Sequence, residues 1–234
     1  VAPTATPTAT PRPAVTPTPT KPPTPAGPTP GGVIKLPLAS DPTSWDPVNR
    51  LNPTLMTKGN VFSFLFSLWP DPPQPGCESG FTKVLVKDWR WVDDRTAEFT
   101  LQQGVKFHNK PPVNGREVVA QDIVFSIERW RTQDWLRTKL ALVKSIEAVD
   151  KYTFRMTASI PWGGMVLELL GHPYGLAAIA QEAGGAKGEL WESPEKSWIG
   201  SGPFTFEKWV PGVRWTLARN PSYWRAGRPL LDGL

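Results

Sequence analysis

The sequence predicts an α/β folding unit, residues 31–234, that follows a proline-rich tail. Short apolar runs alternate with polar residues on either side of turn signals, which is typical of antiparallel hairpins. One stretch carries apolar residues four positions apart, which indicates a helix packed on a core. All 12 tryptophans lie in residues 31–234, whereas residues 1–30 hold 11 of the 28 prolines. The large apolar side chains that a core needs are therefore confined to residues 31–234.

Residues 1–30 form the tail, and 25 of these 30 positions are Pro, Thr or Ala. Proline removes backbone donors and the tail lacks large apolar side chains, so we expect a disordered Pro/Thr-rich linker, partly polyproline II. Such spacers occur mainly on extracellular proteins, so we expect an extracellular or periplasmic protein tethered to the cell surface. The sequence begins at Val1 without an export signal; we expect that any signal or lipid-bearing cysteine has been removed or was never part of this sequence.

Composition excludes several classes of protein. A single cysteine, Cys77, rules out an internal disulfide framework, a CxxC redox pair and a multi-cysteine zinc site. The net charge of +5 is scattered among acidic residues, which indicates a solvated surface and no nucleic-acid partner. Phosphate-loop, dinucleotide, nucleophile-elbow and HExxH motifs are missing from the sequence. We therefore expect a binding protein and not an enzyme, with no cofactor and no metal site.

The first half of the folding unit predicts strands and one buried helix. Residues 33–40 alternate as a first strand, and residues 41–47 (DPTSWDP) are rich in turn formers. Residues 54–69 are apolar almost all round and predict a buried helix, with a strand as the alternative. Residues 83–108 predict a meander whose first hairpin turns at Asp93-Asp94-Arg95.

A helix is predicted to begin near Arg116, with Asn114 as its cap. Its apolar stripe comprises Val119, Ile123 and Ile127, which we expect to face the core.

The remaining segments predict another helix and two hairpins. Residues 133–143 continue the helical pattern, and residues 145–158 form a hairpin around Asp150-Lys151. Residues 200–220 form a last hairpin with Pro211-Gly212 at its turn. His108 is expected to be structural or exposed, because it ends a predicted strand beside a proline pair.

The tryptophans leave two functions open. Most must fill the core, but those on predicted strands could also line a binding face: Trp89, Trp91, Trp209 and Trp215. Indole rings stack on sugars, so a secreted carbohydrate-binding or carbohydrate-active module on a Pro/Thr linker is the alternative function.

Four segments in order resemble the extracellular solute-binding proteins of family 5, the peptide- and nickel-type receptors of ABC importers. They are 31–47, with the D-P pair; 89–129, with QQGVKFHNKPP and AQDIVFS; 145–156; and 198–224, with GSGPF and NPSYW. Departures from the family pattern lie in turn chemistry, for example Ser201 where threonine is usual.

The resemblance implies a fold like that of type II periplasmic binding proteins. Residues 31–234 would form most of lobe one, a mixed sheet with helices plus a smaller β-rich subdomain, truncated before the second lobe. The implied function is the substrate-binding component of an ABC importer, which captures peptides or similar small solutes between two lobes. The implied partners are the ligand and the permease subunits, with a monomeric receptor held to the membrane only through a possible lipid anchor.

The resemblance also nominates ligand-binding residues. A segment shortly after the D-P pair runs beside the bound peptide in the family, and here it comprises Arg50, Leu51, Asn52 and Pro53. An aromatic residue after the F-S-x-E-R helix can face the cleft, which nominates Trp135. The alternative for both is an ordinary loop and an ordinary core residue.

Overall fold

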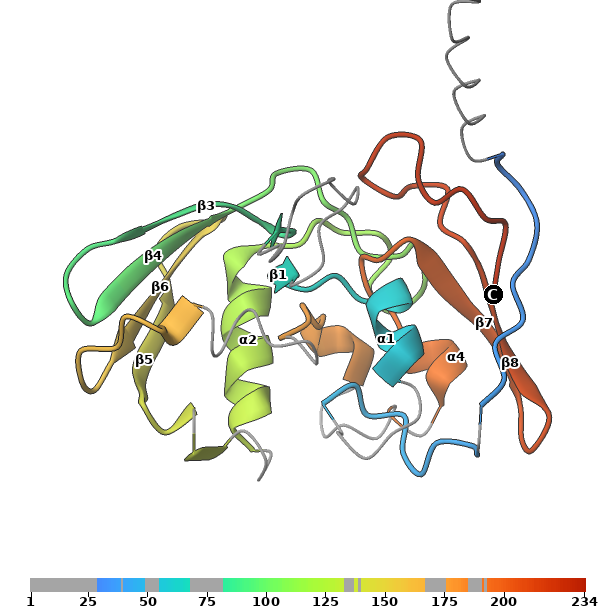
Figure 1. Cartoon of the computed structure of the whole chain (residues 1–234), viewed down its shortest axis with the longest axis horizontal. Helices are drawn as coiled ribbons and strands as arrows, with labels where there is room; N and C mark the ends of the chain where they lie inside the picture. Colours follow the sequence, from blue (N-terminus) through green and yellow to red (C-terminus); the bar gives the residue numbers. More distant parts are fainter. Residues whose placement is uncertain are drawn as a thin grey trace, which may run out of the picture.

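Helix α2, Ala120–Arg131, lies in the middle of the molecule, between a four-stranded sheet and a two-stranded hairpin (Figure 1). The computed structural model describes residues 29–38, 40–48, 55–67, 82–132, 137–138, 140–166, 176–184, 191 and 193–234. In this part of the chain, no helix is long and apolar enough to span a lipid bilayer.

The four-stranded sheet confirms two of the predicted hairpins. Its strands are β3 (Val86–Trp91), β4 (Thr96–Leu101), β5 (Val143–Ala148) and β6 (Thr153–Ala158). They run antiparallel in the order β3-β4-β6-β5. Alternate residues of β4 and β6 point to the core and are buried: Ala97, Phe99, Leu101, Phe154, Met156 and Ala158.

An aspartate builds each of the two hairpin turns. Asp93 Oδ1 accepts hydrogen bonds from the amides of Arg95, at 2.8 Å, and Thr96, at 2.7 Å. Asp150 Oδ1 accepts equivalent bonds from Tyr152 and Thr153, at 2.7 and 2.8 Å. Both acidic turns are therefore structural, as side-chain to backbone bonding at turns predicts.

The predicted start of α2 is wrong by one turn. Residues 116–118 are extended and pair with residues 105–107, because Phe107 N donates to Arg116 O and Val118 N donates to Val105 O. Asn114 caps no helix; it has a φ of 53° in a turn, and its Nδ2 donates to Pro112 O at 3.0 Å. The helix begins only at Ala120, where the Val119 amide donates to the Asp122 carboxylate at 2.9 Å.

The other side of α2 carries short elements around the last hairpin. These elements are α1 (Leu55–Val61), β1 (Phe66–Ser67), β2 (Thr82–Lys83), the 3₁₀ helix η2 (Gln181–Gly184) and α4 (Pro194–Ser197). The hairpin of β7 (Phe204–Val210) and β8 (Arg214–Arg219) confirms the prediction for residues 200–220. The Val33–Gly233 bridge is parallel, so the pairing beside this antiparallel hairpin is mixed.

Two predicted elements are shorter than expected. The helix expected over 54–69 ends at Val61, because the amide of Gly202 occupies the Val61 carbonyl at 2.9 Å. Among the described residues of the strand expected over 33–40, pairing is reduced to a single bridge between Val33 and Gly233. In each case a distant segment, and not the local pattern, decides where the element ends.

Trp45 joins the D-P segment to the β7–β8 hairpin. Its ring lies 5.1–5.5 Å, centroid to centroid, from the rings of Trp198, Phe206, Trp209 and Trp215, all in edge contact. Trp198 Nε1 also donates to the Trp45 carbonyl at 2.6 Å. We call these five residues the Trp45 cluster. Trp45, Trp198 and Phe206 are buried, and the partly buried Trp209 and Trp215 pack against the same core, so the cluster is part of a core and not an open ligand platform.

Candidate functional site

The residues nominated as ligand contacts, Arg50, Leu51, Asn52, Pro53 and Trp135, lie outside the described residues. Cys77 and His172 lie outside them as well, together with residues 133–136 and 139 of the predicted helix 133–143. The structure does describe the chain that leads to each nominated segment. Residues 41–48 precede the first segment, and the end of α2 precedes Trp135.

A salt bridge connects these two approaches. Arg129 Nη2, in the last turn of α2, donates to Asp46 Oδ2, and the two side chains are each 23% exposed. The other oxygen of Asp46 accepts the amide of Val48 at 3.1 Å, and the Arg129 guanidinium lies over the ring of Trp191 at 5.0 Å. The chain entering residues 49–54 is thus fixed to the end of the helix that leads to Trp135.

Lys58 lies buried beside this salt bridge. Its side chain comes from α1, and its Nζ is 3.9 Å from the centroid of the Trp130 ring. Burial lowers the pKa of Lys58 well below its usual range, and the attraction of Asp46 opposes that shift only in part. Asp46, Lys58 and Arg129 together gather one acid and two basic groups at the end of the lobe where the nominated segments begin.

The G-S-G-P motif, residues 200–203, bonds to the end of α1 and to the loop that precedes α2. Gly202 N donates to Val61 O, Ser63 Oγ donates to Ser201 O at 3.0 Å, and His108 N donates to Gly200 O at 2.7 Å. A Cβ on Gly200 would lie 2.0 Å from the Val61 carbonyl oxygen, so no other residue fits there without a shift. This motif therefore acts through backbone packing.

His108 is buried against the same loop, and it is structural, as predicted. Its Nε2 lies 3.0 Å from the carbonyl oxygen of Gly202, which requires the Nε2–H tautomer because a carbonyl only accepts. Desolvation lowers the pKa of His108 to about 4, so the ring is neutral at pH 7.

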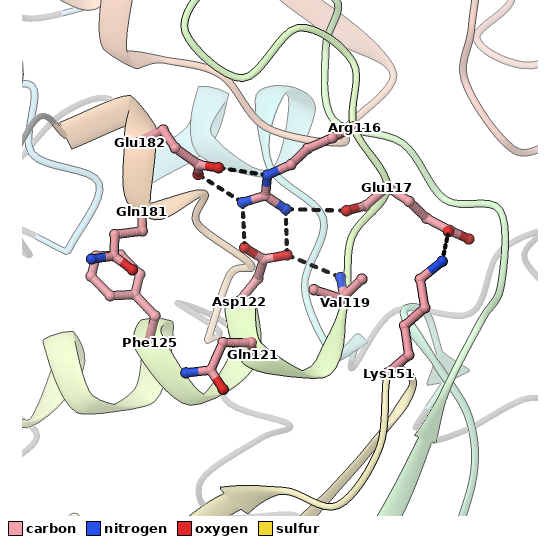
Figure 2. Close-up of a pocket in the computed structure, with 9 residues that line it drawn as sticks. All are labelled: Arg116, Glu117, Val119, Gln121, Asp122, Phe125, Lys151, Gln181 and Glu182. Atoms are coloured by element: carbon pink, nitrogen blue, oxygen red, sulfur yellow. Dashed lines mark hydrogen bonds and ion pairs between the residues drawn. The ribbon is translucent and has the colours of Figure 1, made fainter.

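An open pocket of about 770 Å³ lies at the opposite end of α2, around Arg116 (Figure 2). Figure 2 shows the guanidinium of Arg116 between two carboxylates, Asp122 on α2 and Glu182 on η2. Its nitrogens donate to both oxygens of each at 2.7–2.8 Å and to the Glu117 carbonyl at 3.1 Å. These partners raise the pKa of Arg116 further, so it stays charged.

The second charged group of this pocket is also paired. Glu117 accepts bonds from Lys151 and Tyr152, each at 2.8 Å, and from the Gly104 amide, and together these lower its pKa to about 2. Asp122 is buried, and Arg116 neutralises it. Because these charged side chains are already paired with one another, we interpret them as a structural network of salt bridges. The network ties residues 104–117 and η2 to the start of α2. The sequence pattern placed Arg116 at a helix start and gave no sign of this network, since the partner Glu182 is 66 residues away.

Charged side chains gather at both ends of α2, but they do not form a metal centre. Within the described ranges, no group of three or more His, Cys, Asp or Glu side chains is placed to hold a metal ion. The two ends instead offer a paired charge network at one and, at the other, a cluster of charged residues on the chain that leads to the nominated segments.

The chain belongs to the bacterial extracellular solute-binding proteins of family 5, whose middle-region model matches residues 80–234. This match includes in full three of the four segments that carry the resemblance: 89–129, 145–156 and 198–224.

Curated relatives of this chain include binding proteins for short peptides. The chain is 31% identical over 172 residues to di/tripeptide-binding protein 2 of Pseudomonas aeruginosa, and the match covers 64% of this chain and 31% of the relative. It is 29% identical over 156 residues to the glutathione-binding protein GsiB of Salmonella typhi, and this match covers 64% of this chain and 28% of the relative. The chain thus spans about a third of the length of these relatives.

Solved structures with the same fold include proteins with bound peptides. DppA of Helicobacter pylori, in complex with the peptide STSA, matches with a TM-score of 0.68 and 25% identity, over 88% of this chain and 42% of that one. AppA of Bacillus subtilis, in complex with a nonapeptide, matches with a TM-score of 0.71 and 23% identity, over 88% and 40%. These matches confirm the type II periplasmic-binding-protein fold and do not support the carbohydrate-module alternative.

Proposed function

We propose that this chain is the first lobe of the substrate-binding component of an ABC importer, and that the whole receptor captures peptides or similar small solutes between two lobes. The observation that carries the proposal is the family 5 match over residues 80–234, together with the likeness to peptide-bound DppA and AppA. Permease subunits are the partners that this function requires. Ligand capture then depends on lobe closure and involves no bond-making step.

The proposed ligand contacts are residues 50–53 and Trp135. Arg50, Leu51 and Asn52 would hydrogen-bond the peptide backbone as an added strand does, while Pro53 has no amide to donate. The Asp46–Arg129 salt bridge supports this assignment, because it fixes the approaches to both segments at one end of α2. Trp135 would supply an apolar contact for a ligand side chain.

The tail adds a proposed location. Residues 1–30 would act as an extended spacer, about 3.1 Å per residue, that holds a monomeric receptor away from the membrane. A lipid anchor upstream of Val1 would make the receptor an extracellular or periplasmic lipoprotein, with residues 31–234 as its first folded part.

Peptide titration followed by NMR tests the proposal on this chain. Di-, tri- and pentapeptides are added at millimolar concentration, because one lobe supplies only part of the contacts of a closed receptor. We expect amide shift changes at residues 50–52 and at the Trp135 indole. Trp135→Ala should weaken the response, whereas Trp89→Ala, on the four-stranded sheet, should leave it intact. Shift changes confined to other regions, or binding to insoluble polysaccharide in place of peptide, would refute the proposal.

A further inference from the structure

Lys58 is a buried amine to which the described residues offer no hydrogen-bond acceptor. The residue is 2% exposed, and its Nζ lies 3.9 Å from the centroid of the Trp130 ring. This cation–π contact offsets only part of the cost of taking an ammonium out of water. A buried charge that makes no hydrogen bond destabilises a fold, so its presence here requires a reason other than stability.

Lys110 shows how the same fold satisfies another lysine that is partly withdrawn from solvent. Its Nζ donates to the Phe206 carbonyl at 2.8 Å, and the carboxylates of Glu195 and Glu207 oppose the lowering of its pKa by burial. Lys58 is buried more deeply than Lys110, yet it has no carbonyl partner within the described residues. Its three N–H donors are therefore available to a group that the described part of the chain does not supply.

Asp46 attracts Lys58 without bonding to it. The two oxygens of Asp46 already accept other donors, Oδ2 from Arg129 Nη2 and Oδ1 from the Val48 amide at 3.1 Å. The attraction opposes the lowering of the Lys58 pKa only in part. One acid thus stands against two bases, Lys58 and Arg129, and one positive charge of this group has no counterpart in it.

Two further donors lie around the same salt bridge. The buried Nε of Arg129 has no acceptor within the described residues, although its Nη2 is bonded to Asp46. The guanidinium lies over the ring of Trp191, whose buried indole Nε1 also lacks an acceptor there. The side chains of Asp46 and Arg129 are each 23% exposed, so this part of the group reaches solvent.

We propose that Lys58 and Arg129 form a subsite that binds a carboxylate group of the ligand, with the Trp191 indole beside it. The inference rests on the proposed function, since it takes the ligand to be a peptide or a similar small solute. A carboxylate has two acceptor oxygens and a full negative charge, so it can accept from an ammonium and a guanidinium at once. It also supplies the counterpart that the second positive charge lacks.

The place of Lys58 in the chain supports a role in ligand selection. Lys58 lies on α1, five residues after Pro53, and Arg129 lies six residues before Trp135. Both basic residues are therefore close in sequence to the segments nominated as ligand contacts. An unbalanced positive charge favours an acidic ligand over a neutral one of the same shape, which makes Lys58 a specificity-determining residue.

Thermal unfolding separates a binding role from a structural one. Lys58→Met keeps an unbranched apolar side chain of similar length and removes the charge. We expect this variant to raise Tm by about 3 °C, because it removes a buried charge without breaking a hydrogen bond of the described residues. Lys83→Met, in an exposed pair with Asp88, is the matched control and should leave Tm within about 1 °C. A lower Tm in Lys58→Met would show that the amine stabilises the lobe, and would overturn the inference.

Titration with a simple carboxylate, followed by NMR, tests the subsite itself. Sodium acetate is compared with sodium chloride at equal ionic strength, and the indole signals of Trp130 and Trp191 are the reporters. We expect acetate to shift these signals and chloride to leave them in place. Lys58→Met should reduce the acetate shift at least about fivefold, whereas Lys83→Met should retain it.

Three peptides then distinguish the two sources of a carboxylate, the C-terminus and an acidic side chain. They are Ala-Ala-Ala, Ala-Ala-Ala-amide and Ala-Glu-Ala-amide. We expect at least one of the two peptides with a carboxylate to bind at least about tenfold more tightly than Ala-Ala-Ala-amide. Preference for Ala-Ala-Ala assigns the C-terminus, and preference for Ala-Glu-Ala-amide assigns an acidic side chain. In Lys58→Met the difference should fall below about twofold.

Two binding results would overturn the inference and leave peptide capture intact. One is equal affinity for the three peptides, and the other is an acetate shift that persists in Lys58→Met. Absence of any shift at residues 50–52 with all three peptides would instead refute the proposed function. The acetate titration and the thermal unfolding need no peptide, so they decide the inference in that case as well.

Discussion

The Nε2 of His108 donates a hydrogen bond to the carbonyl oxygen of Gly202, 94 residues later, at 3.0 Å. The bond joins the loop that precedes α2 to the G-S-G-P motif that precedes β7. Asn220 Nδ2 donates to the same carbonyl at 2.9 Å, so one oxygen receives two buried side chains. The loop before α2 and the two ends of the β7–β8 hairpin meet at this oxygen, and the buried histidine gives the lobe a measurable dependence on pH.

Stability should fall between pH 6.5 and about 4 because of His108. The folded state holds the ring neutral, with its pKa lowered to about 4, whereas the unfolded chain binds a proton near pH 6.5. Stability is therefore fully present above pH 6.5 and is lost as the pH falls towards 4, by about 3 kcal/mol in total. Urea unfolding at a series of pH values measures this slope.

His108→Gln keeps a donor near Gly202 but cannot titrate, so this part of the pH dependence should disappear. His172→Gln removes the other histidine of the chain and serves as the matched control, which should retain the slope. An unchanged slope in His108→Gln would contradict the assignment.

Gly200→Ala should destabilise the lobe by about 3 kcal/mol. The added Cβ would meet the Val61 carbonyl oxygen at 2.0 Å and force the G-S-G-P motif away from the end of α1. Thermal or urea unfolding measures the change. Gly163→Ala is the control: its Cβ would meet nothing within 4 Å, so stability should change by less than about 1 kcal/mol. Equal effects of the two substitutions would show that the close approach does not matter.

Asp46→Asn should lower the free energy of unfolding by about 2 kcal/mol and weaken the peptide response. The substitution keeps the shape of the side chain but leaves the half-buried guanidinium of Arg129 without its charge partner. The approach to residues 49–54 then loses its attachment to α2. The measurements are urea unfolding and the NMR titration. Asp88→Asn, in an exposed pair with Lys83, should change neither the free energy of unfolding nor the peptide response. An equal effect of Asp88→Asn would mean that the loss of one negative charge, and not the loss of the Asp46–Arg129 bond, is responsible.

Arg116→Lys should cost about 2 kcal/mol, although the charge is kept. Lysine cannot donate bidentate bonds to Asp122 and Glu182 at once, and the buried Asp122 carboxylate loses its matched partner. Arg90→Lys, in a pair whose arginine is 73% exposed, should cost less than about 1 kcal/mol. Similar costs in calorimetry would mean that bidentate geometry contributes little.

Features that depend on neighbours in sequence were predictable. The turns at Asp93 and Asp150 follow from a side chain that bonds to amides two and three residues ahead. The buried stripe of α2 follows from the spacing of Ile123 and Ile127, which are 1% and 0% exposed. The interacting residues of each turn, and the residues of the helix stripe, lie within a few positions of one another, so the local sequence is sufficient to predict them.

Features decided by distant segments were not predictable. Asn114 has the chemistry of a helix cap, but residues 116–118 pair with 105–107 and delay the helix to Ala120. The end of α1 depends on Gly202, and the Arg116 pocket depends on Glu182. No spacing rule links these residues. Residues 50–53 and Trp135 remain predictions from the resemblance.

The Trp45 cluster has an optical consequence. The ring of Trp45 lies 5.1–5.5 Å, centroid to centroid, from three other indoles and one phenyl ring, and Trp45 stands only five residues before Arg50. Electronic coupling between rings at such separations gives strong near-ultraviolet circular dichroism and makes emission sensitive to small rotations. The chain therefore carries its own chromophore a few residues before the segment nominated for peptide binding, and a movement of Trp45 can be followed by light, without a label.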